Sequence, residues 1–136
     1  MESFGDLLKN VPEFMLYLAI GFVLLAAFFL VYLWITPHDE LRLIRAGNSA
    51  AALSLAGAVV GFMLPLAIVL SRHANTRAII LWGVVALIIQ VVAFFIARAM
   101  VPGLPKAIED GKISVGAFSG LVALAIGILN AACQTE

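Results

Sequence analysis

The sequence predicts an all-α, polytopic membrane protein whose four transmembrane helices form two tandem helical-hairpin repeats. Of its 136 residues, 64% are hydrophobic and 12% are charged, whereas soluble domains carry about half apolar and about a quarter charged residues. Four apolar stretches lie between the charged residues, and each reaches the roughly 20 residues that cross about 30 Å of hydrocarbon. We therefore expect a single transmembrane domain over residues 1–136, with spans at about 14–36, 47–71, 78–99 and 113–133.

The first span reads FMLYLAIGFVLLAAFFLVYLWIT and is rich in Phe and Leu. Its apolar stretch is longer than the roughly 7 to 15 residues of a signal-peptide core. The preceding segment MESFGDLLKNVPE is not basic, and no clean cleavage site follows TPHDE. We therefore expect a retained helix whose large apolar side chains face lipid.

The second span follows the most polar stretch of the chain, HDELRLIRAGN, and carries small residues at helical spacing. Asn48 can cap this helix at a solvated membrane-interface turn, which is the commoner role, or contact a ligand. On a helix of 3.6 residues per turn, the small residues share one face. We expect this face to pack against protein; it comprises Gly47, Ala50, Ser54, Gly57, Gly61 and Pro65.

The third span resembles the first in its large apolar side chains but carries Gln90 near its middle. An unpaired amide is costly there, so Gln90 indicates a hydrogen bond to a neighbouring helix or a position on a translocation path. Arg98 lies near the end of this span. It is expected to reach the lipid headgroups or to form an ion pair with Glu40, Glu109 or Asp110 from the neighbouring loops.

The fourth span ends in GILNAACQTE and carries a second face of small residues, with an asparagine at its end. Four-residue spacings between small residues allow two helix backbones to approach closely, so we expect the second and fourth spans to lie innermost. Asn130 is expected to bond across this contact and fix its register, or else to line a pore. The face comprises Gly116, Gly120, Ala123, Gly127 and Asn130.

The two halves of the chain resemble each other at an interval of 64 residues. IRAGNSAAALSLAG superposes on IEDGKISVGAFSGL, which aligns Ile44 with Ile108 and Gly47 with Gly111. We therefore expect repeat units at about 14–71 and 78–133. Because each unit crosses the membrane twice, the copies would share one orientation about an axis along the membrane normal.

The basic residues predict the orientation of the chain. Four spans place both termini on one side, and basic residues favour the cytoplasm, so we expect both termini in the periplasm. The loops on the cytoplasmic side would carry Arg42, Arg45, Arg98, Lys106 and Lys112, against Lys9, Arg72 and Arg77 on the other side.

The composition argues against several classes of function. Eight basic and eight acidic residues leave no broad basic surface for nucleic acid. One cysteine, Cys133, and two histidines, His38 and His73, in loops on opposite sides predict neither a metal nor a cofactor site. No span carries a central ionisable residue for a proton relay, and no nucleophile and base converge, so we expect no enzyme.

The phrases IRAGNSAAALSLAGAVVGFMLPLA and IGILNAACQTE, with a third span that reaches Gln90, resemble the domain-of-unknown-function 350 family, the YjfL-like bacterial inner-membrane proteins. The resemblance covers nearly the whole chain and is most specific in the phrases that begin at Gly47 and Gly127. Lys112 stands opposite Asn48, so the GN pair is kept in one half only. The resemblance implies four spans in two tandem hairpins in the cytoplasmic membrane, without an assigned activity.

Two functions follow from these observations. The first is an oligomerising membrane scaffold or accessory subunit in envelope maintenance, which would act through the lipid bilayer, copies of itself and other envelope proteins. The second is a small homo-oligomeric channel or transporter for ions or small solutes. Its path would be lined by Ser54, Gln90, Ser119 and Asn130, and a bundle this narrow would need a dimer or larger ring.

Overall fold

The computed structural model describes residues 3–37, 39–72 and 74–134, and these form helices without any strand. Four helices are long and apolar enough to cross a membrane: α1 (Phe4–Ile35), α3 (Ser49–Ser71), α4 (Thr76–Met100) and α6 (Ile113–Cys133). Two short helices, α2 (Glu40–Arg45) and α5 (Leu104–Glu109), lie in the connections. The predicted all-α, four-span architecture is confirmed.

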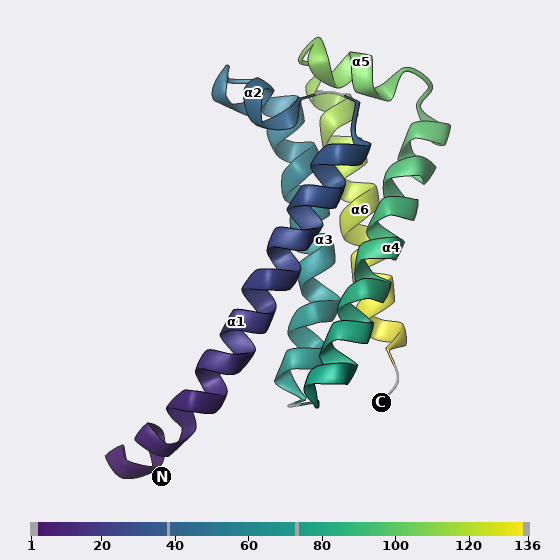
Figure 1. Cartoon of the computed structure of the whole chain (residues 1–136). Coiled ribbons are helices and arrows are strands. Elements are labelled where there is room, and N and C mark those ends of the chain that lie inside the picture. Colours follow the sequence, from purple (N-terminus) through teal and green to yellow (C-terminus); the bar gives the residue numbers. More distant parts are fainter. Residues whose placement is uncertain (1–2, 38, 73, 135–136) are drawn as a thin grey trace.

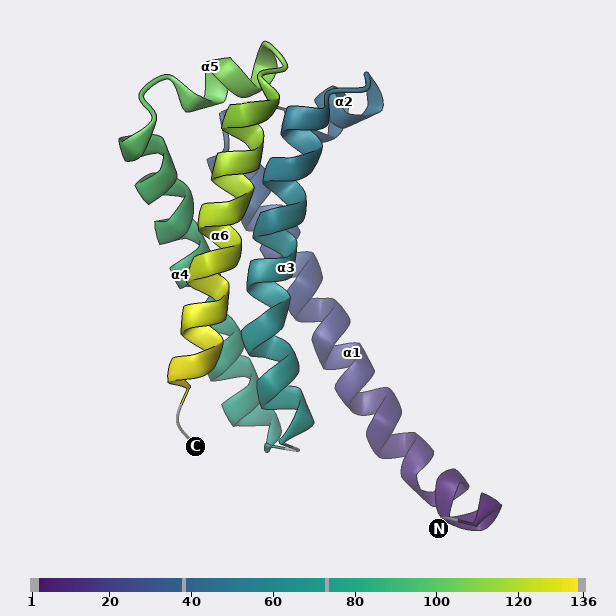
Figure 2. The ribbon, with the colours of Figure 1, turned by 180° about the vertical axis from the view of Figure 1, so that it is seen from behind.

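The helices form a bundle around the pair α3 and α6 (Figure 1). These two helices run side by side and share the most extensive contact in the bundle, while α4 packs against both. The helices α2 and α5 lie at one end of the bundle, and α1 begins and α6 ends at the other. The pair α3 and α6 makes the central contact, as predicted, but no described helix covers its outer face (Figure 2).

The contact between α3 and α6 joins backbone to backbone. A Cβ atom added at the glycines of this contact would overlap the main chain of the facing helix. In lipid there is little hydrophobic drive between helices, so this close approach stabilises the pair through dispersion and Cα–H···O contacts. We call this contact the glycine seam; its pairs are Ala50 with Gly116, Leu53 with Gly120, Gly57 with Gly120, Gly61 with Ala123, and Gly61 with Gly127.

Gly47 does not belong to the glycine seam, although its spacing predicts that it would. It precedes α3 with a φ of +89°, and no atom lies within 4 Å of the position a Cβ would take. This left-handed residue ends α2, and its N–H donates to the carbonyl of Ile44 while that of Asn48 donates to Leu43. The span therefore begins at Ser49, two residues later than its pattern indicates.

The first helix is longer than its apolar stretch. It begins at Phe4, ten residues before the predicted start of the span at residue 14. Ser3 caps it, because the Ser3 hydroxyl accepts from the N–H of Asp6 and the Ser3 N–H donates to the Asp6 carboxylate, each at 3.3 Å. At 1.5 Å per residue, its 32 residues measure about 48 Å, more than the hydrocarbon core of about 30 Å.

α1 packs against the bundle from Tyr17 onwards, whereas its residues before Tyr17 are exposed. The ring of Phe28 stacks on that of Phe62 in α3 with centroids 4.6 Å apart, and Tyr32 meets the ring edge of Phe94 in α4. Gly83 of α4 leaves room for Leu24. Towards its N-terminus the helix diverges from the other three (Figures 1 and 2).

The short helices and the turns that follow them recur at an interval of 64 residues. α5 is as long as α2 and begins 64 residues later, and α6 begins 64 residues after α3. Gly111, with a φ of +79°, follows Gly47 at the same interval and ends α5 through equivalent backbone hydrogen bonds, from its own N–H to Ile108 and from Lys112 to Ala107. These matches support the interpretation of two tandem hairpins, which stays a prediction.

Replacing Gly127 with alanine should destabilise the bundle, because the new methyl group would overlap the backbone of Gly61. We expect a loss of about 1 to 3 kcal/mol in the free energy of unfolding, seen as a lower thermal midpoint in detergent. Gly21→Ala is the matched control, since its methyl group would meet only the Leu70 side chain, at 3.6 Å, and alanine favours helix. Equal stability of both variants would contradict the glycine seam.

Candidate functional site

Polar side chains are buried at successive levels of the bundle, where an unpaired polar group is costly. We call this set the polar line. Each member is at most 8% exposed, so its partners within the protein determine what it can do. The polar line comprises Tyr32, Glu40, Ser54, Gln90, Ser119, Asn130 and Gln134.

At the end nearest α2, four helices meet in a cluster of oxygen atoms. The hydroxyl of Ser54 donates to that of Ser119 at 3.2 Å, which joins α3 to α6. Tyr32 of α1 lies close to the Ser54 side chain and within electrostatic range of the carboxylate of Glu40. Glu40 is the first residue of α2 and is fully buried. The cluster thus links α1 and α2 to the glycine seam.

The turn that the sequence predicts before α3 is exposed at Arg42 and Arg45, but Glu40 at its start is buried, because α2 turns this side chain into the bundle. Arg98 is exposed on α4, as a side chain that reaches the headgroups would be. Asp110, one of the partners considered for Arg98, instead lies 3.3 Å from the ammonium group of Lys106. The ion pair between Glu40 and Arg98 stays a prediction.

Gln90 ties α4 to the glycine seam at the middle of the bundle. Its Nε2 donates to the carbonyl of Ala123 at 3.2 Å, and the side chain is 1% exposed. Gly61 makes room for it, since a Cβ there would lie 2.9 Å from Nε2. This is the interhelical hydrogen bond that the sequence offered as one alternative. The Oε1 atom has no hydrogen-bond partner within the described part of the chain.

Towards the end of α6, Asn130 and Gln134 also face inward. The Nδ2 of Asn130 makes no hydrogen bond to the residues that the structure describes, so the predicted bond across the seam is not made by this atom. The Nε2 of Gln134 donates to the carbonyl of Pro65 at 3.0 Å. The sequence did not single out Gln134 or Tyr32; the four-residue spacing from Asn130 to Gln134 is the one signal that would have indicated the former.

Asn48 connects the two halves of the chain at the end near α2 and α5. Its Oδ1 accepts from the N–H of Ala51 at 3.0 Å and so caps α3. Its Nδ2 donates to the carbonyl of Ile108 at 2.7 Å and to that of Glu109 at 3.4 Å. Because the last carbonyls of a helix lack intrahelical donors, one amide completes the start of α3 and the end of α5. Lys112, at the equivalent place before α6, makes no such side-chain cap.

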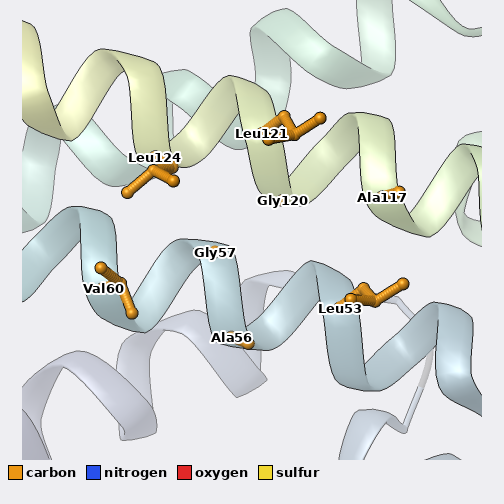
Figure 3. A pocket seen from close by; sticks show the side chains of 8 residues that line it. All are labelled: Leu53, Ala56, Gly57, Val60, Ala117, Gly120, Leu121 and Leu124. Carbon is orange, nitrogen blue, oxygen red and sulfur yellow. The ribbon is translucent and has the colours of Figure 1, made fainter.

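On the outer side of the glycine seam, α3 and α6 enclose an apolar groove of about 360 Å³ (Figure 3). Small residues form its floor and larger apolar side chains its walls. The eight lining residues fall into four pairs separated by 64 positions. These pairs are Leu53 with Ala117, Ala56 with Gly120, Gly57 with Leu121, and Val60 with Leu124.

One residue discussed from the sequence takes no part in these sites. Cys133 is a free thiol at the exposed end of α6. His38 and His73 lie outside the described residues, so their expected places in opposite loops stay predictions.

One family model matches the sequence over almost the whole chain. The family model described as Domain of Unknown Function (DUF350) matches residues 6–134. The chain belongs to the DUF350 family. The resemblance inferred from the sequence is thereby confirmed.

Relatives of this DUF350 protein are membrane proteins. The chain is 36% identical over 129 residues to the UPF0719 inner membrane protein YjfL of Escherichia coli (strain K12), which covers 95% of this chain and 98% of that protein. It is 24% identical over 134 residues to the UPF0719 transmembrane protein YshE of Bacillus subtilis (strain 168). This match covers 97% of this chain and 98% of that protein. No solved structure matches the chain. With four apolar helices, the chain is a multi-pass inner-membrane protein.

Replacing Asn48 should separate its two roles. Asn48→Asp keeps the cap on α3 but loses the donor to α5, whereas Asn48→Ala loses both. We expect Asn48→Ala to lower the free energy of unfolding by about 2 kcal/mol, combining a lost cap with a carbonyl left without its donor. Thermal unfolding in detergent is the measurement.

Asn75→Ala is the matched control for this comparison. Asn75 caps α4 by accepting from the N–H of Ala78 at 2.8 Å, in an exposed setting. We expect a loss of about 1 kcal/mol. If Asn48→Ala lowers the free energy of unfolding no more than Asn75→Ala does, the hydrogen bonds from Asn48 to α5 contribute nothing to stability.

Proposed function

We propose that this protein is a homo-oligomerising membrane scaffold or accessory subunit, built from two related hairpins, that acts in envelope maintenance through copies of itself and other envelope proteins. The observation that carries this proposal is the apolar groove on the outer face of α3 and α6. The proposal assigns the protein no catalytic chemistry.

A second copy of the chain is the occupant that suits this groove best. Its floor consists of Ala and Gly, which let another helix approach closely, and its walls supply apolar side chains for dispersion contacts. The lining residues pair at an interval of 64 positions, so the two sides of the groove come from corresponding positions of α3 and α6. A surface of this kind favours a twofold dimer in which both subunits use the same face.

The polar line supports the same interpretation, because it turns hydrogen-bonding groups inward. Gln90 and Gln134 bond to main-chain carbonyls within the chain, and Ser54 bonds to Ser119. The surface left for partners within the membrane is therefore largely apolar. Association there depends on shape rather than charge.

Filling the groove should abolish self-association without unfolding the subunit. Ala56 is exposed and lines the groove (Figure 3), so Ala56→Phe adds a ring where a second helix would approach. Leu129→Phe adds bulk at an exposed position of α6 that does not line the groove. Single-molecule photobleaching in liposomes should show dimers or larger assemblies for the native chain and Leu129→Phe, but monomers for Ala56→Phe.

The scaffold proposal fails if the native chain is monomeric in lipid and crosslinking in cells captures no partner. If the native chain assembles and Ala56→Phe assembles equally well, the groove is not the interface.

The second candidate is a small channel or transporter. Gln90 Oε1 and Asn130 Nδ2 favour it, because both are buried and neither has a hydrogen-bond partner in the part of the chain that is described. Polar atoms of this kind can bind water or a passing ion in an oligomer. Liposome flux that exceeds empty-vesicle leak, and that falls in Gln90→Leu and Asn130→Leu, is the expected result. Absence of flux under every gradient would exclude this candidate.

A further inference from the structure

We propose that residues 4–11 of α1 form an amphipathic segment that lies in the membrane–water interface and is hinged to the span at Pro12. We call it the interfacial segment. This inference concerns how the chain contacts lipid and is independent of the proposed scaffold.

The interfacial segment has two opposite faces. At about 100° per residue, Phe4, Leu7, Leu8 and Val11 fall within an arc of about 100°. The polar residues Asp6, Lys9 and Asn10 fall within a similar arc on the other side. The four apolar side chains are 46 to 75% exposed, so the described part of the chain leaves this face uncovered.

The length of α1 places this face beside the bilayer surface. The apolar stretch from Phe14 to Ile35 has 22 residues, about 33 Å at 1.5 Å per residue, which already crosses a hydrocarbon core of about 30 Å. Residues 4–11 therefore lie beyond the core. In a straight continuation, their apolar face would stand in water, although the bilayer interface is directly adjacent.

Pro12 provides the bend that the segment needs. Proline has no N–H, so the carbonyl of Leu8 loses its helical donor and the helix can bend there. The capping box of Ser3 and Asp6 keeps the segment helical when it turns away from the span. Because α1 already diverges from α3, α4 and α6 at this end (Figures 1 and 2), the described helices leave space for the movement.

The charges of the segment indicate which force holds it at the interface. Within residues 4–11 the charges of Asp6 and Lys9 cancel, so anionic headgroups offer no net attraction. Adsorption then depends on the apolar face, as in other amphipathic helices that lie in the interface. We therefore infer that the depth of the interfacial segment in the bilayer does not depend on anionic lipid.

Spin labels on the full-length chain in lipid vesicles test the proposal. In a Cys133→Ser background, Leu8→Cys places a label on the apolar face and Asn10→Cys places its matched control on the polar face. The Leu8→Cys label should be accessible to oxygen and shielded from a water-soluble nickel chelate, and the Asn10→Cys label should show the reverse. Vesicles of phosphatidylcholine, with or without phosphatidylglycerol, should give the same result.

Two outcomes would overturn the inference. Equal nickel accessibility of both labels would mean that the segment stands in water. A Leu8→Cys label shielded from both reagents, with spin–spin broadening that disappears on dilution with unlabelled protein, would mean that the face contacts a second copy.

Pro12→Ala tests the hinge separately. A straighter helix should raise the nickel accessibility of the Leu8→Cys label several-fold and leave the thermal midpoint of the bundle unchanged, because the segment makes little contact with it. Unchanged accessibility would show that Pro12 is not the hinge.

Discussion

The backbone contact between α3 and α6 is the constraint on which the rest of this structure depends. Helices in lipid gain little from hiding apolar side chains from one another, so their association depends on close approach. Gly57, Gly116, Gly120 and Gly127 permit that approach, because a side chain at any of them would overlap the facing backbone. With α3 and α6 fixed, α4 and the C-terminal half of α1 have a surface to pack on.

The glycine seam also explains why polar side chains can be buried here. Because Gly61 has no side chain, the amide of Gln90 has room beside α3 and α6. Gln90 reaches the carbonyl of Ala123, and Gln134 reaches that of Pro65. Asn48 applies the same chemistry at the end of the bundle, where it bonds to the last carbonyls of α5. The hydrogen bonds thus fix the register of a contact that dispersion alone would leave free to slide.

The sequence predicts the spans and the glycine seam well, because length, hydropathy and a 3.6-residue period determine both. It fails where two elements meet. Gly47 has the spacing of the seam but ends α2, and only its positive φ reveals this. Glu40 reads as part of a solvated turn, yet α2 buries it near Tyr32. The direction of a side chain in such a turn depends on how the short helix packs, which no local pattern records.

Glycine-selective ¹³C labelling, with solid-state NMR in lipid bilayers, tests the central claim most directly. The seam places Gly57 against the backbone of Gly120 and Gly127 against that of Gly61. We expect interhelical cross-peaks for both pairs, at separations within about 4.5 Å, that persist when labelled protein is diluted with unlabelled protein. Absence of both cross-peaks in folded protein would contradict the glycine seam and everything that depends on it.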